Sequence, residues 1–137
     1  MKTILAAVLL IAAVPAAAET LVVKVMGAGD GGQIVAAIYA AADGFSGFNI
    51  KKALAVQMAP VSAGGATLTF AGLKPGRYAV SAFHDADKDG EVKTNFIGMP
   101  KEAVGVSNNP GGMPGFAKSQ VAVPAGAPIE INLRKIG

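Results

Sequence analysis

The residues of this chain with the clearest chemical pattern are three alternating aspartates, Asp85, Asp87 and Asp89, in the segment FHDADKDGEV. Gly90 follows the third of them. Alternating carboxylates followed by a glycine open an EF-hand calcium loop, in which carboxylate oxygens bind the ion and the glycine permits a sharp turn. The spacing therefore indicates a Ca2+ site. A surface turn that hydrogen-bonds to itself is the open alternative, because aspartate and glycine are also ordinary turn residues.

The second half of an EF-hand is missing from this segment. Glu91 fits the loop by donating its backbone carbonyl, but Lys93 replaces an oxygen ligand and Phe96 stands where the bidentate glutamate is required. The flanking residues alternate as strands do, which excludes the helical version of the loop. A calcium loop between strands would instead recruit the side chain of Asn95 or Glu102 from later in the segment.

A hydrolase is the catalytic alternative, with His84, Asp85 and Glu102 as its residues. His84 is the only histidine of the chain, which excludes a metal site with several histidine ligands. Neighbouring residues of a strand point to opposite faces of a sheet, so His84 and Asp85 do not form the line of a Ser-His-Asp triad. We therefore predict no catalytic residues and expect His84 to tie the long loop to the strand through a hydrogen bond.

The N-terminal sequence MKTILAAVLLIAAVPAAAET has the three parts of a secretory signal peptide. Lys2 supplies a positive charge, an apolar stretch follows, and small residues ending at Ala18 form a cleavage site. Removal of residues 1–18 leaves 119 of the 137 residues, which is enough for a single domain over residues 19–137. We expect a periplasmic or extracellular protein, and the hydrolase alternative would act in the periplasm.

The composition limits the possible partners. The formal net charge is +3 and the charges are scattered, so no basic stripe indicates a nucleic acid partner. The chain has no second apolar stretch of the roughly 20 residues that a transmembrane anchor needs. It contains no cysteine, which excludes disulfides and thiolate metal sites, so its stability depends on an ordinary hydrophobic core. We expect a monomer whose partner is an unknown envelope protein or a glycan.

Apolar residues alternate with polar ones in about seven short segments, separated by turns rich in glycine and proline. This pattern is typical of half-buried strands in an antiparallel sheet. Seven such strands in one domain predict an all-β fold, an antiparallel β-sandwich. The predicted strands span residues 20–26, 33–40, 53–58, 66–70, 77–83, 119–123 and 129–135.

Two connections in this pattern are long. Residues 41–52 have room for a helical turn, and Phe45 and Phe48 within them are expected to cover a sheet edge. Residues 85–116 form a loop excursion too long for a routine hairpin, and long loops in compact domains are usually functional or mobile. A third possible function is therefore a module that docks a partner through residues 85–116.

The glycines Gly27, Gly29 and Gly32 follow the first predicted strand with the spacing of a dinucleotide-binding fingerprint. The strand predicted at residues 53–58 ends without the acidic residue that would bind the ribose, and the chain is too short for the usual two-halved parallel sheet. We therefore interpret the glycine run as a hairpin turn.

Residues 84–116 follow a longer pattern that begins with His-Asp, continues through Ser-Asn-Asn and ends with Gly-x-Pro-x-Phe. The residues that carry it are His84, Asp85, Asp87, Asp89, Gly90, Asn95, Gly98, Pro100, Glu102, Gly105, Ser107, Asn108, Asn109, Gly112, Pro114 and Phe116. Together with the preceding strand FAGLKPGRYAVSAF, the pattern resembles a family of secreted bacterial proteins known as domain of unknown function 2141 (DUF2141). The strand also resembles, more loosely, transthyretin-like and collagen-binding-B-type sandwich modules.

The resemblance implies an exported, transthyretin/Ig-like sandwich, and it implies no activity because the family has none established. The chain departs from the family pattern in its charges. Asp87 and Asp89 stand where asparagine is common, which adds negative charge, and Lys93 stands where aspartate is common, which removes it. Val106 replaces the usual phenylalanine before the Ser-Asn-Asn sequence.

Overall fold

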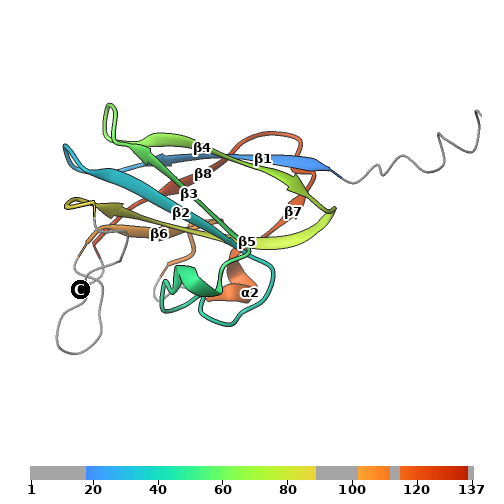
Figure 1. Ribbon diagram of the computed structural model, residues 1–137. Helices are drawn as coiled ribbons and strands as arrows, with labels where there is room; N and C mark the ends of the chain where they lie inside the picture. Colours follow the sequence, from blue (N-terminus) through green and yellow to red (C-terminus); the bar gives the residue numbers. More distant parts are fainter. Residues whose placement is uncertain (1–17, 89–101, 112–114, 136–137) are drawn as a thin grey trace, which may run out of the picture.

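The computed structural model describes residues 18–88, 102–111 and 115–135, which form two packed β-sheets (Figure 1). The smaller sheet has the strand order β4-β1-β8, and the larger has the order β3-β2-β5-β6 with β7 also paired to β5. The prediction of an all-β sandwich is confirmed, with eight strands where about seven were expected. The elements are β1 (Glu19–Met26), β2 (Gln33–Tyr39), η1 (Ile50–Lys52), β3 (Ala55–Pro60), β4 (Ala66–Leu73), β5 (Gly76–Asp85), β6 (Val104–Val106), α2 (Phe116–Ser119), β7 (Gln120–Val123) and β8 (Ile129–Asn132).

The main core lies between the two sheets and follows from the alternation of the strands. Leu21, Val23 and Val25 of β1 are buried, while the residues between them are half-buried or exposed. They pack in one cluster with Ile34 and Ile38 of β2. Burying an aliphatic side chain of this size contributes about 1.5–3 kcal/mol, so this core can hold the fold without disulfides.

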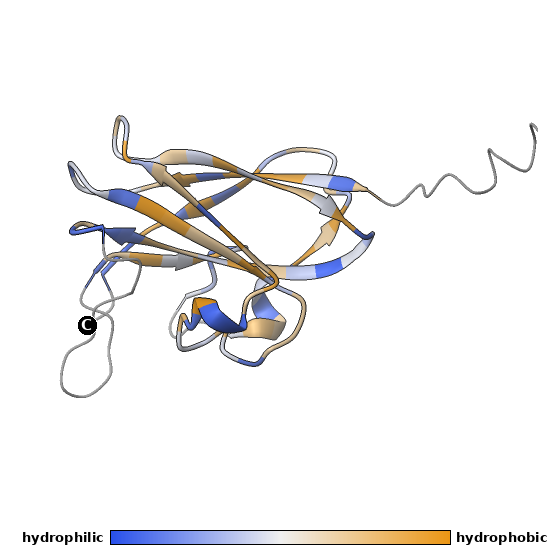
Figure 2. Ribbon diagram, viewed as in Figure 1, coloured by the Kyte–Doolittle hydropathy of each residue, from blue (hydrophilic) through white to orange (hydrophobic). Residues whose placement is uncertain are grey.

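The larger sheet is buried on both faces, so its central strands do not alternate. Figure 2 shows an almost unbroken hydrophobic run along β2, and every residue of β2 after the first is buried. Val35 and Tyr39 on the outer face pack in a second cluster with Phe45 and Phe48 from the β2–β3 connection. The rings of Tyr39 and Phe45 meet edge to face at a centroid distance of 5.2 Å. The two phenylalanines therefore cover the face of the sheet, not its edge.

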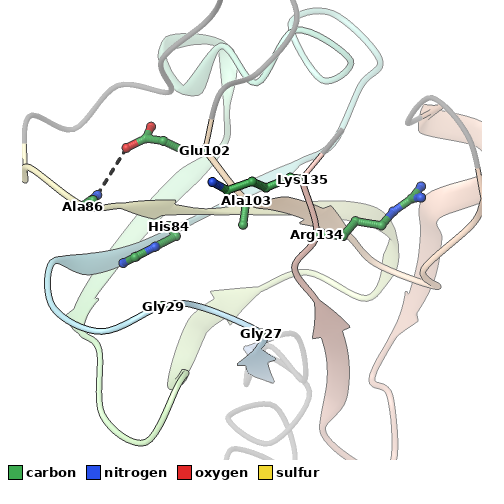
Figure 3. Close-up of a pocket in the computed structure, with 8 residues that line it drawn as sticks. All are labelled: Gly27, Gly29, His84, Ala86, Glu102, Ala103, Arg134 and Lys135. Carbon is green, nitrogen blue, oxygen red and sulfur yellow. Dashed lines mark hydrogen bonds between the residues drawn. The ribbon is translucent and has the colours of Figure 1, made fainter. Parts of the chain in front are cut away.

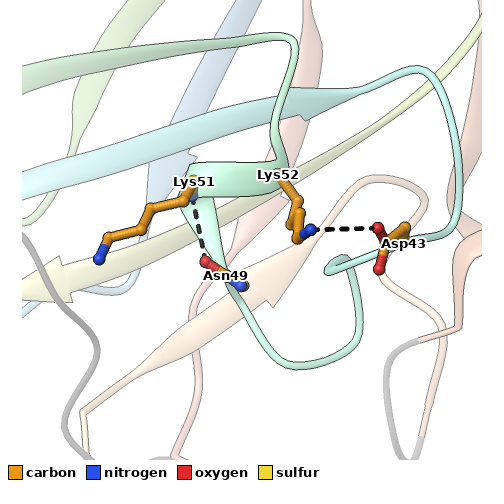
Figure 4. A network of polar contacts seen from close by, with 4 residues as sticks. All are labelled: Asp43, Asn49, Lys51 and Lys52. Carbon is orange, nitrogen blue, oxygen red and sulfur yellow. Dashed lines mark hydrogen bonds and ion pairs between the residues drawn. The ribbon is translucent and has the colours of Figure 1, made fainter.

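The connection that carries these phenylalanines is shaped by local polar contacts (Figure 4). The side chain of Asn49 accepts a hydrogen bond from the Lys51 backbone N–H at 3.2 Å and caps η1, which confirms the helical turn expected within residues 41–52. Lys52 and Asp43 form an ion pair at 3.6 Å. Because both side chains are exposed, this pair is worth less than about 1 kcal/mol, and the buried aromatic rings are what fix the segment.

The excursion at residues 85–116 contains a strand that the sequence pattern did not predict. Strand β6 pairs with β5 from Ser81 to Phe83, and β7 pairs with the same edge of β5 further back, from Gly76 to Ala79. Val104 of β6 also exchanges two backbone hydrogen bonds with Arg134, at 2.8 and 2.9 Å, just beyond β8. This bridge joins the two sheets along one side of the sandwich. Residues 89–101 and 112–114, which also belong to the predicted docking loop, lie outside the described residues.

The sequence predicts a hairpin turn at the glycine run after β1. This prediction is wrong. Strands β1 and β2 belong to different sheets, so the connection crosses from one sheet to the other. Gly32 has a φ of +69°, and a Cβ there would lie 2.5 Å from the Asp85 carbonyl oxygen. Glycine is required at this position because the β1–β2 connection packs directly on the backbone at the end of β5.

Among the described residues, no helix is long and apolar enough to cross a membrane. The predicted signal peptide lies outside the described residues, apart from Ala18 at its end, and its cleavage stays a prediction. One strand pairing differs from the expected antiparallel pattern, since β8 runs parallel to β1.

Candidate functional site

Three of the predicted metal ligands meet at one end of the sandwich. Asp85 is the last residue of β5, Asp87 lies in the turn that follows, and Glu102 lies just before β6. One carboxylate oxygen from each residue lies within 4.8 Å of the corresponding oxygens of the other two. We call these three residues the acidic triad. The other predicted ligands, Asp89, Glu91 and Asn95, lie outside the described residues.

The sheet itself positions Asp85. This residue is fully buried and is paired with Gln33 across β2 and β5. The Gln33 side-chain amide donates a hydrogen bond of 2.8 Å to the Asp85 carboxylate. The Asp85 carbonyl accepts a longer bond of 3.4 Å from the backbone N–H of Lys88, whose φ of 59° is left-handed. The chain thus makes a tight turn directly after a rigid carboxylate.

Glu102 reaches the same turn from the other side of the excursion. Its carboxylate accepts a hydrogen bond of 3.2 Å from the backbone N–H of Ala86. The next residue, Ala103, accepts a backbone bond of 2.9 Å from the N–H of His84. Because β6 begins directly after these contacts, the strand pairing that the sequence did not reveal is what brings Glu102 to the two aspartates.

The spacing of the acidic triad suits a calcium ion. Calcium binds hard oxygen atoms at about 2.3–2.6 Å, so two oxygens on one ion lie at most about 5 Å apart. The three carboxylate oxygens meet this limit. They supply three of the six to eight ligands that calcium takes, and Asp87 is exposed, so an ion can enter from solvent.

His84 is bound elsewhere. Its Nε2 lies 2.8 Å from the carbonyl oxygen of Gly31, so the ring contacts the β1–β2 connection. The sequence predicts that the ring holds the long loop instead, and this prediction is wrong. Its neighbour Asp85 belongs to the opposite, outward row of β5. Asp85 and Glu102 converge, but His84 is not part of their group, and the hydrolase alternative gains no support from this arrangement.

A hollow of about 370 Å3 opens beside the acidic triad (Figure 3). We call it the end hollow. Its walls come from the β1–β2 connection, the end of β5, the start of β6 and the segment after β8. Figure 3 shows the side chain of Lys135 extending over Ala103, while that of Arg134 points the opposite way. The lining residues are Gly27, Gly29, His84, Ala86, Glu102, Ala103, Arg134 and Lys135.

The Ser-Asn-Asn sequence after β6 has a structural role. The buried Ser107 hydroxyl accepts a bond of 3.0 Å from the Val80 N–H and donates to the Ser119 carbonyl. Val80 is the residue of β5 between the stretch that pairs with β6 and the stretch that pairs with β7. The Ser107 hydroxyl therefore supplies the hydrogen-bond acceptor for the Val80 N–H where neither strand does.

The two asparagines that follow hold neighbouring elements to this edge. Asn108 donates to the carbonyls of Lys118 and Gln120 at 3.1 and 2.9 Å. Asn109 accepts from the Asn132 N–H at 2.8 Å and donates to a further carbonyl of β8 at 3.0 Å. Both asparagines have left-handed φ angles, 68° and 45°, which asparagine tolerates better than most residues. This part of the pattern therefore joins neighbouring strands.

Two buried hydroxyls lie on the outer face of the larger sheet. Burial raises the pKa of Tyr39 above its usual 10.0, and the nearby Ser81 hydroxyl offsets part of that rise. Neither hydroxyl meets hydrogen-bond geometry with a partner in the described part of the chain. The pair is a feature of the second core and lies apart from the acidic triad.

Comparison with known proteins identifies a family for this chain. No curated protein and no solved structure matches the chain. Residues 23–132 match a family described as uncharacterized proteins conserved in bacteria. This range includes almost all of the sandwich, the acidic triad and the Ser-Asn-Asn sequence, and it confirms the resemblance inferred from the loop. The chain therefore belongs to the DUF2141 family.

Proposed function

We propose that this chain is an exported β-sandwich protein of the cell envelope that acts by binding or structural support, and that Ca2+ stabilises the mouth of its long loop. The observation that carries the calcium site is the convergence of the carboxylates of Asp85, Asp87 and Glu102 within 4.8 Å. The signal-peptide pattern at the N-terminus supports export.

The charges of the acidic triad favour a cation. Two unit charges 4 Å apart repel by about 1 kcal/mol in water and by several kcal/mol where the surroundings are less polar. Asp85 is fully buried and Glu102 is partly buried, so water screens them less than it screens surface residues. A bound Ca2+ would remove this repulsion, and Asp89, the Glu91 carbonyl and Asn95 are the proposed ligands that complete its shell.

Thermal unfolding of the mature chain with and without calcium tests the proposal. If the dissociation constant is about 0.1–1 mM, as in extracellular calcium modules, 10 mM calcium adds about 1.4–2.7 kcal/mol of stability. For a domain of this size that corresponds to a rise in Tm of roughly 5–10 °C. Asp87→Ala should abolish the rise, since it removes an exposed ligand without altering the core.

The matched control is Asp43→Ala, which removes an exposed aspartate from the β2–β3 connection. This variant should keep the full response to calcium. Identical melting curves of the wild-type chain in calcium and in chelator would show that the turn is stabilised by its own hydrogen bonds, and would overturn the proposal.

A further inference from the structure

The end hollow has the size and lining of a small-molecule site. Ligand sites in proteins have volumes of about 300–1,000 Å3, and the hollow, at about 370 Å3, lies near the lower limit. It opens between the two sheets, where four chain segments meet. A molecule of about one sugar ring therefore suits it better than a larger ligand.

Lys135 gives the hollow a positive charge. Among the residues that the structure describes, its ammonium group makes no ion pair or hydrogen bond, and Figure 3 shows it extending over Ala103. Glu102 also lines the hollow, and its carboxylate accepts the hydrogen bond of the Ala86 N–H, while the Arg134 side chain points away from Lys135. An ammonium group in this position is complementary to a carboxylate, because charge-assisted hydrogen bonds are stronger than neutral ones.

His84 adds a hydrogen-bond acceptor. Its Nε2 lies 2.8 Å from the Gly31 carbonyl, and a carbonyl oxygen can only accept, so Nε2 must carry the hydrogen. In the neutral ring Nδ1 then has a lone pair. No described residue hydrogen-bonds to Nδ1. A ligand hydroxyl is a suitable donor for this atom.

Glycine backbone forms one wall of the hollow and leaves room for a ring. Gly27 has no space for a side chain, since a Cβ there would lie 2.7 Å from the Leu133 carbonyl oxygen. Gly29 does have space: a Cβ would meet only His84 Cε1, at 3.7 Å. A larger side chain at position 29 would therefore project beside His84 and fill the hollow without straining the backbone.

We propose that the end hollow binds a small hydroxycarboxylate, with its carboxylate paired to Lys135 and a hydroxyl donating to His84 Nδ1. A sugar acid such as a uronate carries both groups on one ring, and lactate carries them on a short chain. This binding goes beyond the proposed function: its two contacts, Lys135 and His84, lie outside the acidic triad, and the triad shares only Glu102 with the lining of the hollow.

Titrations followed by 1H–15N NMR test the proposal with four probes: glucuronate, lactate, acetate and glucose. Glucuronate and lactate should produce saturable shifts of the amides that line the hollow. Acetate, which lacks the hydroxyl, should bind about tenfold more weakly, and glucose, which lacks the carboxylate, should produce no saturable shift. Tighter binding of glucuronate than of lactate would indicate a sugar acid as the ligand, and the reverse order would indicate a simple hydroxy acid.

Two variants and their controls locate the binding. Lys135→Met should raise the dissociation constant at least tenfold, and Gly29→Leu should abolish binding. Lys118→Met and Gly47→Leu remove an exposed lysine and an unhindered glycine elsewhere, and both should bind as the wild-type chain does. The calcium response of Lys135→Met should be unchanged, which separates this proposal from the proposed function.

Three results would overturn the inference. They are the absence of a saturable shift with both hydroxycarboxylates, unchanged binding in Lys135→Met, and binding of glucose as tight as that of glucuronate. The spectrum of Gly29→Leu away from the hollow shows whether that variant is folded. If Gly29→Leu is not folded, the binding measured for Lys135→Met alone tests the proposal. That variant is expected to fold, because Lys135 is exposed and lies outside the core.

Discussion

The side-chain amide of Gln33 donates a 2.8 Å hydrogen bond to the buried carboxylate of Asp85, directly across the pairing of β2 and β5. A buried carboxylate is costly unless it is hydrogen-bonded, so this contact allows the acidic triad to begin inside the sheet. The first proposed calcium ligand is thereby held by the sandwich and does not depend on the conformation of the loop.

Gln33→Leu should lower the free energy of unfolding by about 2 kcal/mol in calcium-free buffer, because a hydrogen bond to a charged group contributes about 1.5–3 kcal/mol. Equilibrium unfolding in urea measures the change. Gln57→Leu, at an exposed position of β3, is the control and should change stability by less than about 0.5 kcal/mol. Equal effects of the two substitutions would show that the contact with Asp85 is not stabilising.

Two buried serines, Ser81 in β5 and Ser107 beside that strand, should respond differently to replacement by alanine. Ser107→Ala removes the partner of the buried Val80 N–H and should cost about 1–3 kcal/mol. Ser81→Ala removes a hydroxyl without a hydrogen-bond partner among the described residues, so it should be neutral or slightly stabilising. Urea unfolding of both variants checks the difference, and a larger loss for Ser81→Ala would contradict the assigned role of Ser107.

Stability should fall at alkaline pH because of Tyr39. Its pKa is raised in the folded chain, mainly by burial, so the folded state holds the proton more tightly than the unfolded state does. The unfolded chain loses the proton first, near pH 10.0, and the stabilising contribution is lost as pH rises from there through the folded pKa. Urea unfolding between pH 9 and about 11.5 should show a steeper loss for the wild-type chain than for Tyr39→Phe. Parallel pH profiles would contradict this.

The sequence predicted the sandwich well because its strands alternate, as in β1, where the apolar residues face a single core. It did not reveal how the strands are shared between the sheets. The connection after β1 resembles a hairpin turn locally, and only the packing of Gly32 on the Asp85 backbone shows that it crosses between sheets. Strand β6 has only three residues, too few for alternation to stand out, although the valines on either side of Gly105 were a signal.

The candidate site was predicted in part. Asp85 and Asp87 were evident from their spacing, because a turn brings nearby residues together. Glu102 was included as a weaker ligand, and its approach depends on the pairing of β6, which local sequence does not encode. Gln33 and Lys135 were missed, since one is far from the loop in sequence and the other follows β8. A polar residue at the head of the apolar strand β2 was the available signal for Gln33.

The most direct test of the central claim is a crystal structure of the mature chain grown in millimolar calcium. We predict an ion bound at about 2.3–2.6 Å to carboxylate oxygens of Asp85, Asp87 and Glu102, and its absence when Asp87 is replaced by alanine. Carboxylates held only by side chains, backbone N–H groups or water, with no ion between them at that calcium concentration, would contradict the account.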